Sequence, residues 1–588
     1  MKKSLLITLL LAVSMIANAV PAKRGWQTRI QADGTTVEIQ LIGDEFYHFM
    51  INRDGKEVRL NDAGMYEVVG EAPSPARVQA RRIKAQARRQ RKEIGVKPNL
   101  APKGVVILAN FADTKMKSEH TRDVFDELCN AANCTVNNGY PSAAEYFADQ
   151  SDGQYRPTFD VFGPVTLSKG YAYYGKNIKI GDDEQDEFAT DAAIEACLIA
   201  NRQYPELNFA DYDSDKDEYV DFVYIIYAGK GEADGGVANT IWPHNWEIMN
   251  QVLPFNDDGE YDPEHGTRLS CCYTEDSVLV DGVSLNNYAM SSELSGNASF
   301  TGIGTLCHEF GHVIGLPDFY DVYYGTNHEQ QLTPGEWNIM DSGSYNGKGH
   351  CPPNYDPWEK YFMGWHTPKN LGNSGRRLTL AANGTEDYNA YQINNSGKQE
   401  DATQAGLNYY IENRQQQGWD KFVPAAGMLI WKVDYDEQVW VNNEPNAEDR
   451  KPRFTLVIPS GTKIGEDYGA QNVWPYNSKN SWTGVNGKPL LEITRDGDKI
   501  NAIYIEDITS FTVQWIVNGE LLEAKEYNLD GTEDLVLPTK SFEACENTKF
   551  IGWTTHENWC DPFTTPEDLF TEAQGKVTDQ VTYYAVFE

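Results

Sequence analysis

The pattern of hydrophobic and polar positions changes along the chain. In residues 35–69, short alternating stretches such as 36–41 are separated by the turn-forming pairs Gly43-Asp44 and Asp54-Gly55. Alternation interrupted by such pairs predicts β-hairpins. The pattern changes near residue 100, so we predict that the N-terminal region is a separate unit.

The next region mixes strand and helix signals. Residues 104–109 are a continuous apolar run, which is typical of a buried strand, and residues 222–227 indicate a further strand. The sequence from Pro141 has the character of a helix start, and residues 187–199 indicate a second helix. We therefore predict an α+β fold for this part of the chain.

Beyond residue 366 the helical period disappears. Residues 408–412, 427–433 and 454–458 alternate or run apolar between Gly, Pro and Asn, which predicts strands of a β-rich unit, a sandwich packed against the preceding one. Strand-like stretches return at 511–515, 534–538 and 582–587. Together with residues 550–553, these resemble the small β-grasp repeats of secreted and surface bacterial proteins, which implies an adhesive or spacing module.

One segment carries the clearest chemistry. His308 and His312 stand four residues apart, so on a helix both imidazoles project from one face and can reach one zinc ion. Glu309 is placed to take a proton from water rather than to bind the metal. Gly315 permits a sharp turn after the second histidine, and this turn can return Asp318 as a third ligand. A fourth position left open is typical of a catalytic zinc site.

This segment has other interpretations. The helix could be buried with both histidines bonded to backbone carbonyls. A glutamate from a later helix, Glu329 or Glu336, could replace Asp318 as third ligand, but neither lies in a helical pattern. Cys307 lies off the face that the histidines share, so we interpret it as a buried thiol. Ser299 or Thr301 is the expected N-cap of the helix.

The pattern H-E-x-x-H-x-x-G-x-x-D, followed by residues 319–321 and 337–345, resembles the immune inhibitor A family of secreted bacterial metallopeptidases. Residues 412–415 and 418–420 extend the likeness. Members of that family resemble metzincins, whose methionine turn underlies the zinc, and Met340 matches it. The resemblance implies a metzincin-like domain with zinc endopeptidase activity, in which His308, His312 and Asp318 bind zinc and Glu309 is the general base. Tyr320, His328 and Tyr345 are weaker candidates for assisting the reaction.

A second metal site is one of two interpretations of an acidic segment. Asp213, Asp215, Asp217 and Asp221 occupy positions 1, 3, 5 and 9 of an EF-like loop, the spacing that directs oxygen atoms toward calcium. Position 6 is Glu218 instead of glycine, and position 12 is not a glutamate. A structural calcium site and an acidic solvated turn both remain open.

Composition and charge define the setting. The formal charge of −37 argues against nucleic-acid binding and against attraction to anionic membranes. Lys2 and Lys3 precede an apolar run and a small-residue site at 17–19, which reads as a secretion signal. No later stretch is long and apolar enough to span a membrane. We expect a secreted monomer, extracellular or periplasmic.

A basic segment interrupts the acidic chain between residues 77 and 92. It could be a nucleic-acid arm or a solvated linker helix, but we prefer a trypsin-like processing site that ends a pro-segment. The pro-segment has no cysteine, so Asp44, His48 or Asp54 are the candidates for blocking the site. The predicted units are a signal peptide (1–19), a pro-segment with its linker (20–98), the catalytic domain (99–366), a β-rich domain (367–506) and a C-terminal module (507–588).

Nine cysteines leave at least one unpaired. Cys129/Cys134 and Cys545/Cys560 are the local pairs most suited to disulfides. The whole sequence predicts a zinc endopeptidase that is made as a zymogen, acts on protein or peptide substrates and is activated by a processing protease. Two alternatives remain: a non-catalytic surface-binding protein with a structural zinc helix, and another zinc hydrolase, such as an amidase or glycoprotein-directed enzyme.

Overall fold

The computed structural model describes residues 22–587 except 23–24, 32, 44–47, 62–64, 75–77, 79–102, 181–182, 187, 215, 217, 235, 238, 249–272, 275–276, 297, 322–332, 442, 448–450, 460–467, 506–509, 529–531, 543–547, 556–567, 574 and 578–580. The signal segment, nearly all of the basic segment and the cysteines at 271, 272, 545 and 560 lie outside these residues. Within the described part, no helix is both long and apolar enough to cross a bilayer.

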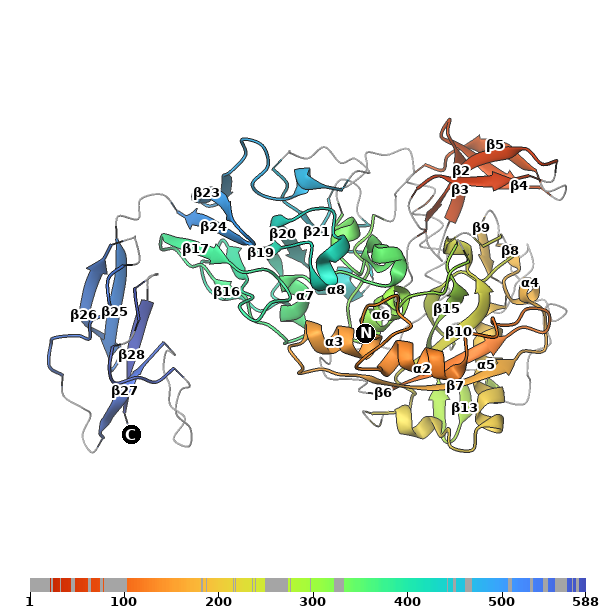
Figure 1. Cartoon of the computed structure of the whole chain (residues 1–588), viewed down its shortest axis with the longest axis horizontal. Helices are drawn as coiled ribbons and strands as arrows, with labels where there is room; N and C mark the ends of the chain where they lie inside the picture. The colour runs from red at the N-terminus through yellow and green to blue at the C-terminus, as the bar shows by residue number, and fades with distance from the viewer. Residues whose placement is uncertain are drawn as a thin grey trace, which may run out of the picture.

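The N-terminal region is an antiparallel sheet of five strands in sequence order, as the alternating pattern predicted. It lies at one end of the molecule, above the strands β10 and β15 (Figure 1). Ile42 and Phe49 on one face pack with Tyr320, and Leu41, which faces the opposite side of the sheet, packs with Trp242. The strands are β1 Gln27–Ile30, β2 Thr36–Gly43, β3 His48–Asn52, β4 Lys56–Leu60 and β5 Tyr66–Glu71.

The central sheet has the strand order β11-β15-β10-β6-β7. Four strands are parallel, and the edge strand β11 runs antiparallel to β15. The central strands β6 and β10 are apolar along most of their length, as expected for strands with both faces covered. The predicted strands near 104–109 and 222–227 are confirmed. The bounds are β6 Lys103–Asn110, β7 Thr158–Thr166, β10 Val223–Lys230, β11 His244–Glu247 and β15 Asn287–Leu294.

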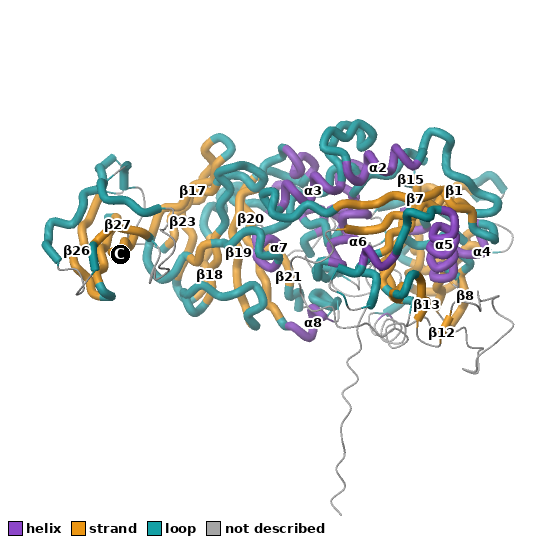
Figure 2. The backbone as a smooth tube through the Cα atoms, turned by 90° about the horizontal axis from the view of Figure 1, so that it is seen from below, coloured by secondary structure: helices purple, strands orange, loops and turns teal. Residues whose placement is uncertain are grey.

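Helices cover this sheet, and Figure 2 shows them gathered around it in one half of the molecule. The two predicted helices are present: one begins after the N-cap Ser142, whose side chain accepts from Glu145 N, and the other contains residues 189–203. The bounds are α2 Arg122–Asn130, α3 Ala143–Gln150, α4 Tyr171–Tyr174, α5 Ala189–Gln203, α6 Gly304–Val313 and α7 Pro357–Phe362. Smaller elements are β8 Asn177–Ile180, β9 Asp183–Asp186, β12 Tyr273–Thr274, β13 Ser277–Val280, β14 Val283–Leu285, η1 Phe209–Tyr212, η2 Glu232–Asp234, η3 Gly335–Trp337 and η4 Ser342–Gly349.

The β-rich region contains two sheets, ordered β16-β18-β19-β20-β21 and β17-β24-β23-β22, with a hydrophobic core between them. A second core is shared with the preceding region, since Trp431 and Phe454 belong to the same buried cluster as Phe310 and Trp358. The bounds are β16 Lys369–Asn370, β17 Arg376–Leu380, β18 Tyr391–Asn394, β19 Gly406–Arg414, β20 Gly427–Tyr435, β21 Phe454–Leu456, β22 Trp482–Val485, β23 Lys488–Asp496, β24 Lys499–Tyr504, α8 Glu437–Val441, η5 Gly418–Phe422 and η6 Ala470–Asn472.

A buried ionic network also joins these two regions. Arg414 donates to Glu412 at 2.7 Å and to Asp420 at 2.8 Å, and all three side chains are fully buried. Asp420 in turn accepts from the side chain of Asn354 at 2.8 Å, just before α7. Buried charges are tolerated only when they are paired and hydrogen-bonded. The network therefore fixes β19 and η5 against the segment that leads into α7.

The C-terminal unit is a four-stranded sheet with the order β26-β25-β28-β27, at the opposite end of the molecule from the N-terminal sheet (Figure 1). Its strands are β25 Phe511–Val517, β26 Glu520–Tyr527, β27 Phe550–Thr554 and β28 Val581–Phe587. The prediction of a strand at 534–538 is wrong. Val536 N donates to the side chain of Tyr527 and Pro538 has no N–H, so this stretch cannot form a regular ladder.

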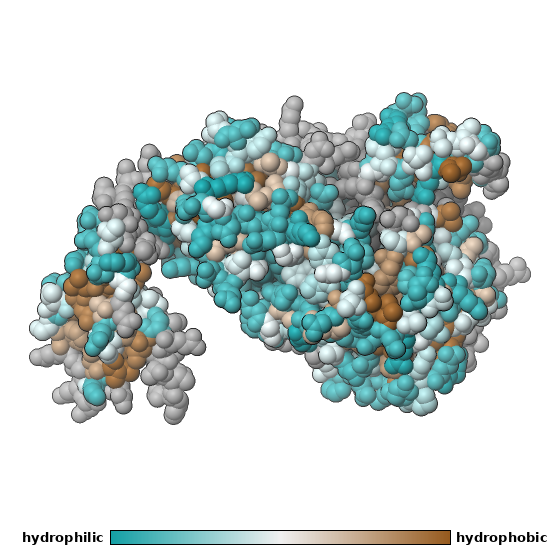
Figure 3. Space-filling model, in the orientation of Figure 1, coloured by the Kyte–Doolittle hydropathy of each residue, from teal (hydrophilic) through white to brown (hydrophobic). Residues whose placement is uncertain are grey.

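The surface seen in Figure 3 is largely hydrophilic, and the described cysteines are unpaired. Hydrophilic residues cover most of the described face in Figure 3, in line with the net charge of −37. Among the described cysteines, Cys129, Cys134, Cys197, Cys307 and Cys351 are all free thiols. The predicted Cys129/Cys134 disulfide is therefore not formed.

Candidate metal centre

The helix α6 carries His308, Glu309 and His312, and the glycines just before it and at its first residue are required by packing. Methyl groups on Gly302 and Gly304 would overlap the carbonyl oxygens of Gly349 and Ser344. The start of the helix is thus pressed directly onto η4, which compensates for the poor helix propensity of glycine. Close backbone approach of this kind is possible only without a Cβ.

The predicted N-cap of α6 is wrong. The helix begins at Gly304 with Ile303 as its N-cap residue, and no side chain caps it. Thr301 instead donates its backbone N–H to Glu293 O at the end of β15. Thr301 is thus held by the end of the strand β15, and the helix begins only at Gly304.

Gly315 makes the turn that ends the helix. Its φ of +103° lies in the region that favours glycine. Leu316 N donates to Gly311 O and Gly315 N donates to His312 O, both at 3.0 Å, which closes the C-terminus of the helix. The chain then reverses and brings Asp318 back toward the histidines, as the spacing predicted.

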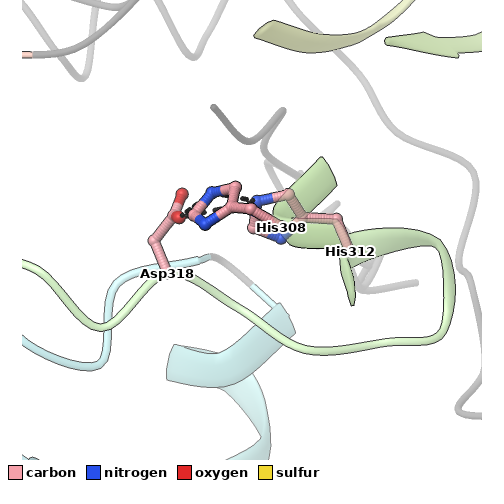
Figure 4. Close-up of side chains that lie close together, drawn as sticks. All are labelled: His308, His312 and Asp318. Atoms are coloured by element: carbon pink, nitrogen blue, oxygen red, sulfur yellow. Dashed lines mark hydrogen bonds and ion pairs between the residues drawn. The ribbon is translucent and has the colours of Figure 1, made fainter. Parts of the chain in front are cut away.

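The structure brings His308, His312 and Asp318 together (Figure 4). The two Nε2 atoms are 3.2 Å apart. Asp318 Oδ1 lies 3.2 Å from His308 Nε2 and 3.5 Å from His312 Nε2. All three side chains are buried. Within the described residues, this is the group of histidine, cysteine and acidic side chains whose ligand atoms converge closely enough to hold a metal ion.

The protonation of the histidines explains why these atoms face each other. His308 Nδ1 lies 2.7 Å from Ile339 O, and His312 Nδ1 lies 2.8 Å from Leu316 O. A carbonyl can only accept, so each Nδ1 carries a proton and each ring turns its Nε2 inward, toward the other ligand atoms. The bonding of the histidines to carbonyls therefore orients them as ligands, and it is not an alternative to metal binding.

The donor set fits a tetrahedral zinc ion. Three lone pairs at one point repel each other unless a cation or a proton lies between them. Ligand atoms at 2.0–2.1 Å from zinc in tetrahedral geometry are about 3.3 Å from one another, close to the 3.2–3.5 Å separations here. Two imidazole nitrogens and one carboxylate oxygen are also ligands that zinc commonly takes.

The electrostatics favour the ligand forms of two of these groups. Burial lowers the pKa of His312 to about 4, so this imidazole is neutral at physiological pH. Burial acts to raise the pKa of Asp318, but the two histidines outweigh it and lower this pKa, which keeps the carboxylate ionised. Burial also raises the pKa of the Cys307 thiol well above its usual value. That thiol lies in the hydrophobic core, outside the metal cluster.

Met340 packs against Gly311 of the helix α6. Its backbone oxygen accepts from Phe319 N at 2.8 Å, directly after Asp318. The preceding residue, Ile339, supplies the carbonyl that orients His308. The backbone of Ile339 and Met340 thus contacts both His308 and the residue that follows Asp318.

The other candidates lie in different settings. Glu309 is buried next to His308, and Tyr320 packs against the N-terminal sheet. Glu336 lies in η3, outside the cluster of metal-binding groups. His328 and Glu329 lie outside the described residues.

The acidic segment is described only in part, because Asp215 and Asp217 lie outside the described residues. Asp213 accepts from Glu218 N at 3.2 Å, and Asp221 accepts from Ser214 N at 3.0 Å. Glu218, at the position where glycine is usual, has a φ of +71°. The backbone therefore makes the sharp turn although the residue is not glycine. Calcium binding stays a prediction.

Comparison with known proteins decides the family. Residues 105–372 match the model of the immune inhibitor A peptidase M6 catalytic domain. The chain carries an immune inhibitor A-like metallopeptidase domain. The family predicted from the zinc-helix motif is thus confirmed. The metallopeptidase domain, so defined, includes α6, the Gly315 turn and Met340.

Two relatives show the extent of the likeness. The pre-pro-metalloprotease PrtV of Vibrio cholerae is 27% identical over 281 residues, which cover 43% of this chain and 28% of PrtV. Immune inhibitor A of Bacillus thuringiensis is 27% identical over 237 residues, which cover 37% of this chain and 31% of that protein. These matches span less than a third of the length of either relative.

Sequence reasoning missed one residue that contacts the group of proposed ligands. Asn443, from the β-rich region, donates from Nδ2 to Asp318 Oδ2 at 2.8 Å. It follows Asp318 by 125 residues, and an asparagine in a polar stretch carries no signal of such a contact. Glu412, Arg414 and Asp420, in the stretch identified by resemblance alone, form the buried ionic network.

Proposed function

We propose that this protein is a secreted zinc-dependent endopeptidase that is made as a zymogen. The convergence of His308 Nε2, His312 Nε2 and Asp318 Oδ1 on one point carries the proposal. These three atoms would hold zinc and leave a position for water or substrate. The matched family supports peptide bonds as the target.

Each residue of the proposed site has a separate role in the reaction. A zinc ion bound there supplies Lewis-acid polarisation of the peptide carbonyl and lowers the pKa of water. Glu309 accepts a proton from the water that attacks the carbonyl carbon. It passes that proton to the amine nitrogen as the C–N bond breaks, so that one water is consumed for each bond hydrolysed. His308, His312 and Asp318 bind the metal throughout and exchange no proton.

A metzincin-like catalytic domain is part of the proposal. The central sheet with four parallel strands and the antiparallel edge strand β11 supports it. The position of Met340 under the helix α6 supports it too, because a metzincin methionine turn underlies its zinc. Structural calcium at Asp213, Asp215, Asp217 and Asp221 remains a further proposal, which the acidic spacing supports.

Secretion and latency rest on the N-terminal residues. The apolar run before residue 19 supports export, and the name of the Vibrio cholerae relative, a pre-pro-metalloprotease, supports a removable pro-segment. The N-terminal sheet packs on Tyr320, two residues after the proposed ligand Asp318. His48 stacks on Trp242 with ring centroids 4.4 Å apart. Cleavage within the basic segment 77–92 would then allow this sheet to leave.

Latency is tested with His48→Ala, and Asp54→Ala is the matched control because Asp54 lies in an exposed turn of the same sheet. The uncleaved His48→Ala protein should leak activity, since its contact with Trp242 is lost. The Asp54→Ala protein should stay as latent as the wild type. If the wild type and both variants are equally latent, His48 does not contribute to blocking the site.

The peptidase itself is tested with the protein cleaved within the basic segment. Casein degradation is compared among the cleaved protein, its Glu309→Ala variant and a sample stripped by a zinc chelator and then restored with zinc. Activity that is lost in the last two samples and returns with zinc supports the proposal. A cleaved protein that binds one zinc but degrades no protein or peptide contradicts it.

A further inference from the structure

The proposed ligand Asp318 is held by a residue outside the matched family domain. Asn443 Nδ2 donates to Asp318 Oδ2 at 2.8 Å, and Asn443 Oδ1 accepts from Asp318 N at 2.5 Å. Both side chains are buried, at 3% and 2% exposure. The matched domain ends at residue 372, so this pair crosses into the β-rich region.

The two hydrogen bonds fix the orientation of both groups. A backbone N–H can only donate and an ionised carboxylate can only accept, so the amide of Asn443 has one possible orientation. With Oδ2 of Asp318 engaged by Asn443, Oδ1 is the oxygen that faces the histidines, 3.2 Å from His308 Nε2. Asn443 therefore selects which carboxylate oxygen is offered to a metal.

The β-rich region holds Asn443 rigidly. Asn443 follows the helix α8, has a φ of +53° and donates its N–H to Trp440 O at 2.9 Å. Asparagine is among the residues that tolerate this left-handed conformation at a helix end. Three residues on, Asn446 donates to Phe319 O at 2.6 Å. Asn443 and Asn446 thus hold the Asp318-Phe319 segment through hydrogen bonds from their side chains.

Aromatic stacking also holds this segment in place. The ring of Phe319 lies parallel to that of Phe454 in β21, with centroids 3.7 Å apart. Asn446 also accepts from Phe454 N at 2.9 Å. The β-rich region therefore contacts the side chain of Asp318, the backbone of Asp318 and Phe319, and the ring of Phe319.

We propose that Asn443 is a positioning residue for the metal centre, so that the β-rich region is needed for tight metal binding. This inference rests on the zinc site proposed above. Partners that hydrogen-bond to a metal ligand typically contribute 10–100-fold to metal affinity. Asn443 contributes by holding Asp318 in the rotamer that presents Oδ1 to the ion.

The test uses Asn443→Asp in the full chain. This substitution keeps the size of the side chain, its tolerance of positive φ and the acceptor for Asp318 N–H. It replaces the Nδ2 donor with an oxygen that faces Asp318 Oδ2. Asn394→Asp is the matched control: Asn394 is also 3% exposed in the β-rich region, and its Nδ2 donates to Asn408 Oδ1 at 3.0 Å, within that region.

The zinc Kd is measured by competition with a chromophoric chelator, and the absorption spectrum of the cobalt-substituted protein reports the ligand geometry. Asn443→Asp should weaken zinc binding about 10–100-fold and alter the cobalt spectrum, while Asn394→Asp should leave both as in the wild type. Wild-type affinity in Asn443→Asp, or equal weakening in the two variants, overturns the inference. A wild-type protein that binds zinc without peptidase activity overturns the proposed function but not this role, whereas one that binds no zinc overturns both.

Discussion

Met340 lies directly against Gly311, the residue that precedes His312 on the helix α6. A methyl group at Gly311 would stand 2.6 Å from the Met340 sulfur and 3.4 Å from the hydroxyl oxygen of Tyr355. Both neighbours are fully buried and have little room to move. Met340 and the helix α6 thus meet at the one position between the histidines where a side chain is missing.

Substitution of Gly311 tests this contact. Gly311→Ala should gain about 1 kcal/mol in helix propensity but lose about 1–3 kcal/mol through overpacking, so its free energy of unfolding should fall. In a Met340→Ala background the overpacking is relieved and the same substitution should cost less. Urea denaturation of the four proteins of this cycle measures the coupling. Additive costs would show that Gly311 and Met340 do not constrain each other.

Metal removal should destabilise the folded protein. A ligand that binds only the native state stabilises it by about 2.7 kcal/mol when its concentration is a hundred times its Kd. Addition of a zinc chelator should therefore lower the Tm of the wild type, and excess zinc should restore it. His308→Ala is the control, because its Tm should respond to neither. A chelator effect of equal size in that variant would place the stabilising metal elsewhere.

The buried ionic network should be sensitive to the loss of one partner. Arg414→Met leaves Glu412 and Asp420 as uncompensated buried charges, which typically costs about 3–5 kcal/mol. Arg53→Met removes an ion pair with Glu38 that is about half exposed, so we expect this substitution to change the free energy of unfolding very little. Thermal or urea unfolding of the two variants measures the difference. Similar small losses of unfolding free energy in both variants would mean that the network does not stabilise the junction between α7 and β19.

Lys360 should give the stability a distinct pH dependence. Burial, together with the nearby Arg414 charge, lowers the pKa of this lysine to about 8 from 10.5. Between these values the unfolded chain binds the proton and the folded chain does not, so the contribution of Lys360 to stability rises with pH across this window. A shift of this size corresponds to on the order of 3 kcal/mol.

The comparison with Lys360→Met isolates that contribution. The difference in unfolding free energy, wild type minus variant, should increase from pH 8 to pH 10.5 and be flat below pH 7. Urea denaturation at a series of pH values measures it. A difference that does not change with pH would show that Lys360 keeps an ordinary pKa in the folded protein.

Local patterns were sufficient for many elements. Alternation between turn pairs predicted the N-terminal hairpins, and apolar runs predicted β6 and β10, because each of these patterns reflects burial on one or both faces of a sheet. The predictions failed where a backbone N–H found a partner that the local pattern does not show. Thr301 pairs with the end of β15 instead of capping α6, and Val536 donates to the Tyr527 side chain instead of to a strand.

The sequence by itself determined the family and the spacing of the proposed ligands, because His308, His312, Gly315 and Asp318 lie within one helix and its turn. Only the tertiary structure decided how these side chains are held. The carbonyl of Ile339 orients His308, and Asn443 directs Asp318 from a region 125 residues away. Spacing along a helix fixes which face a side chain leaves from, whereas its rotamer and protonation depend on neighbours that only the folded chain brings together.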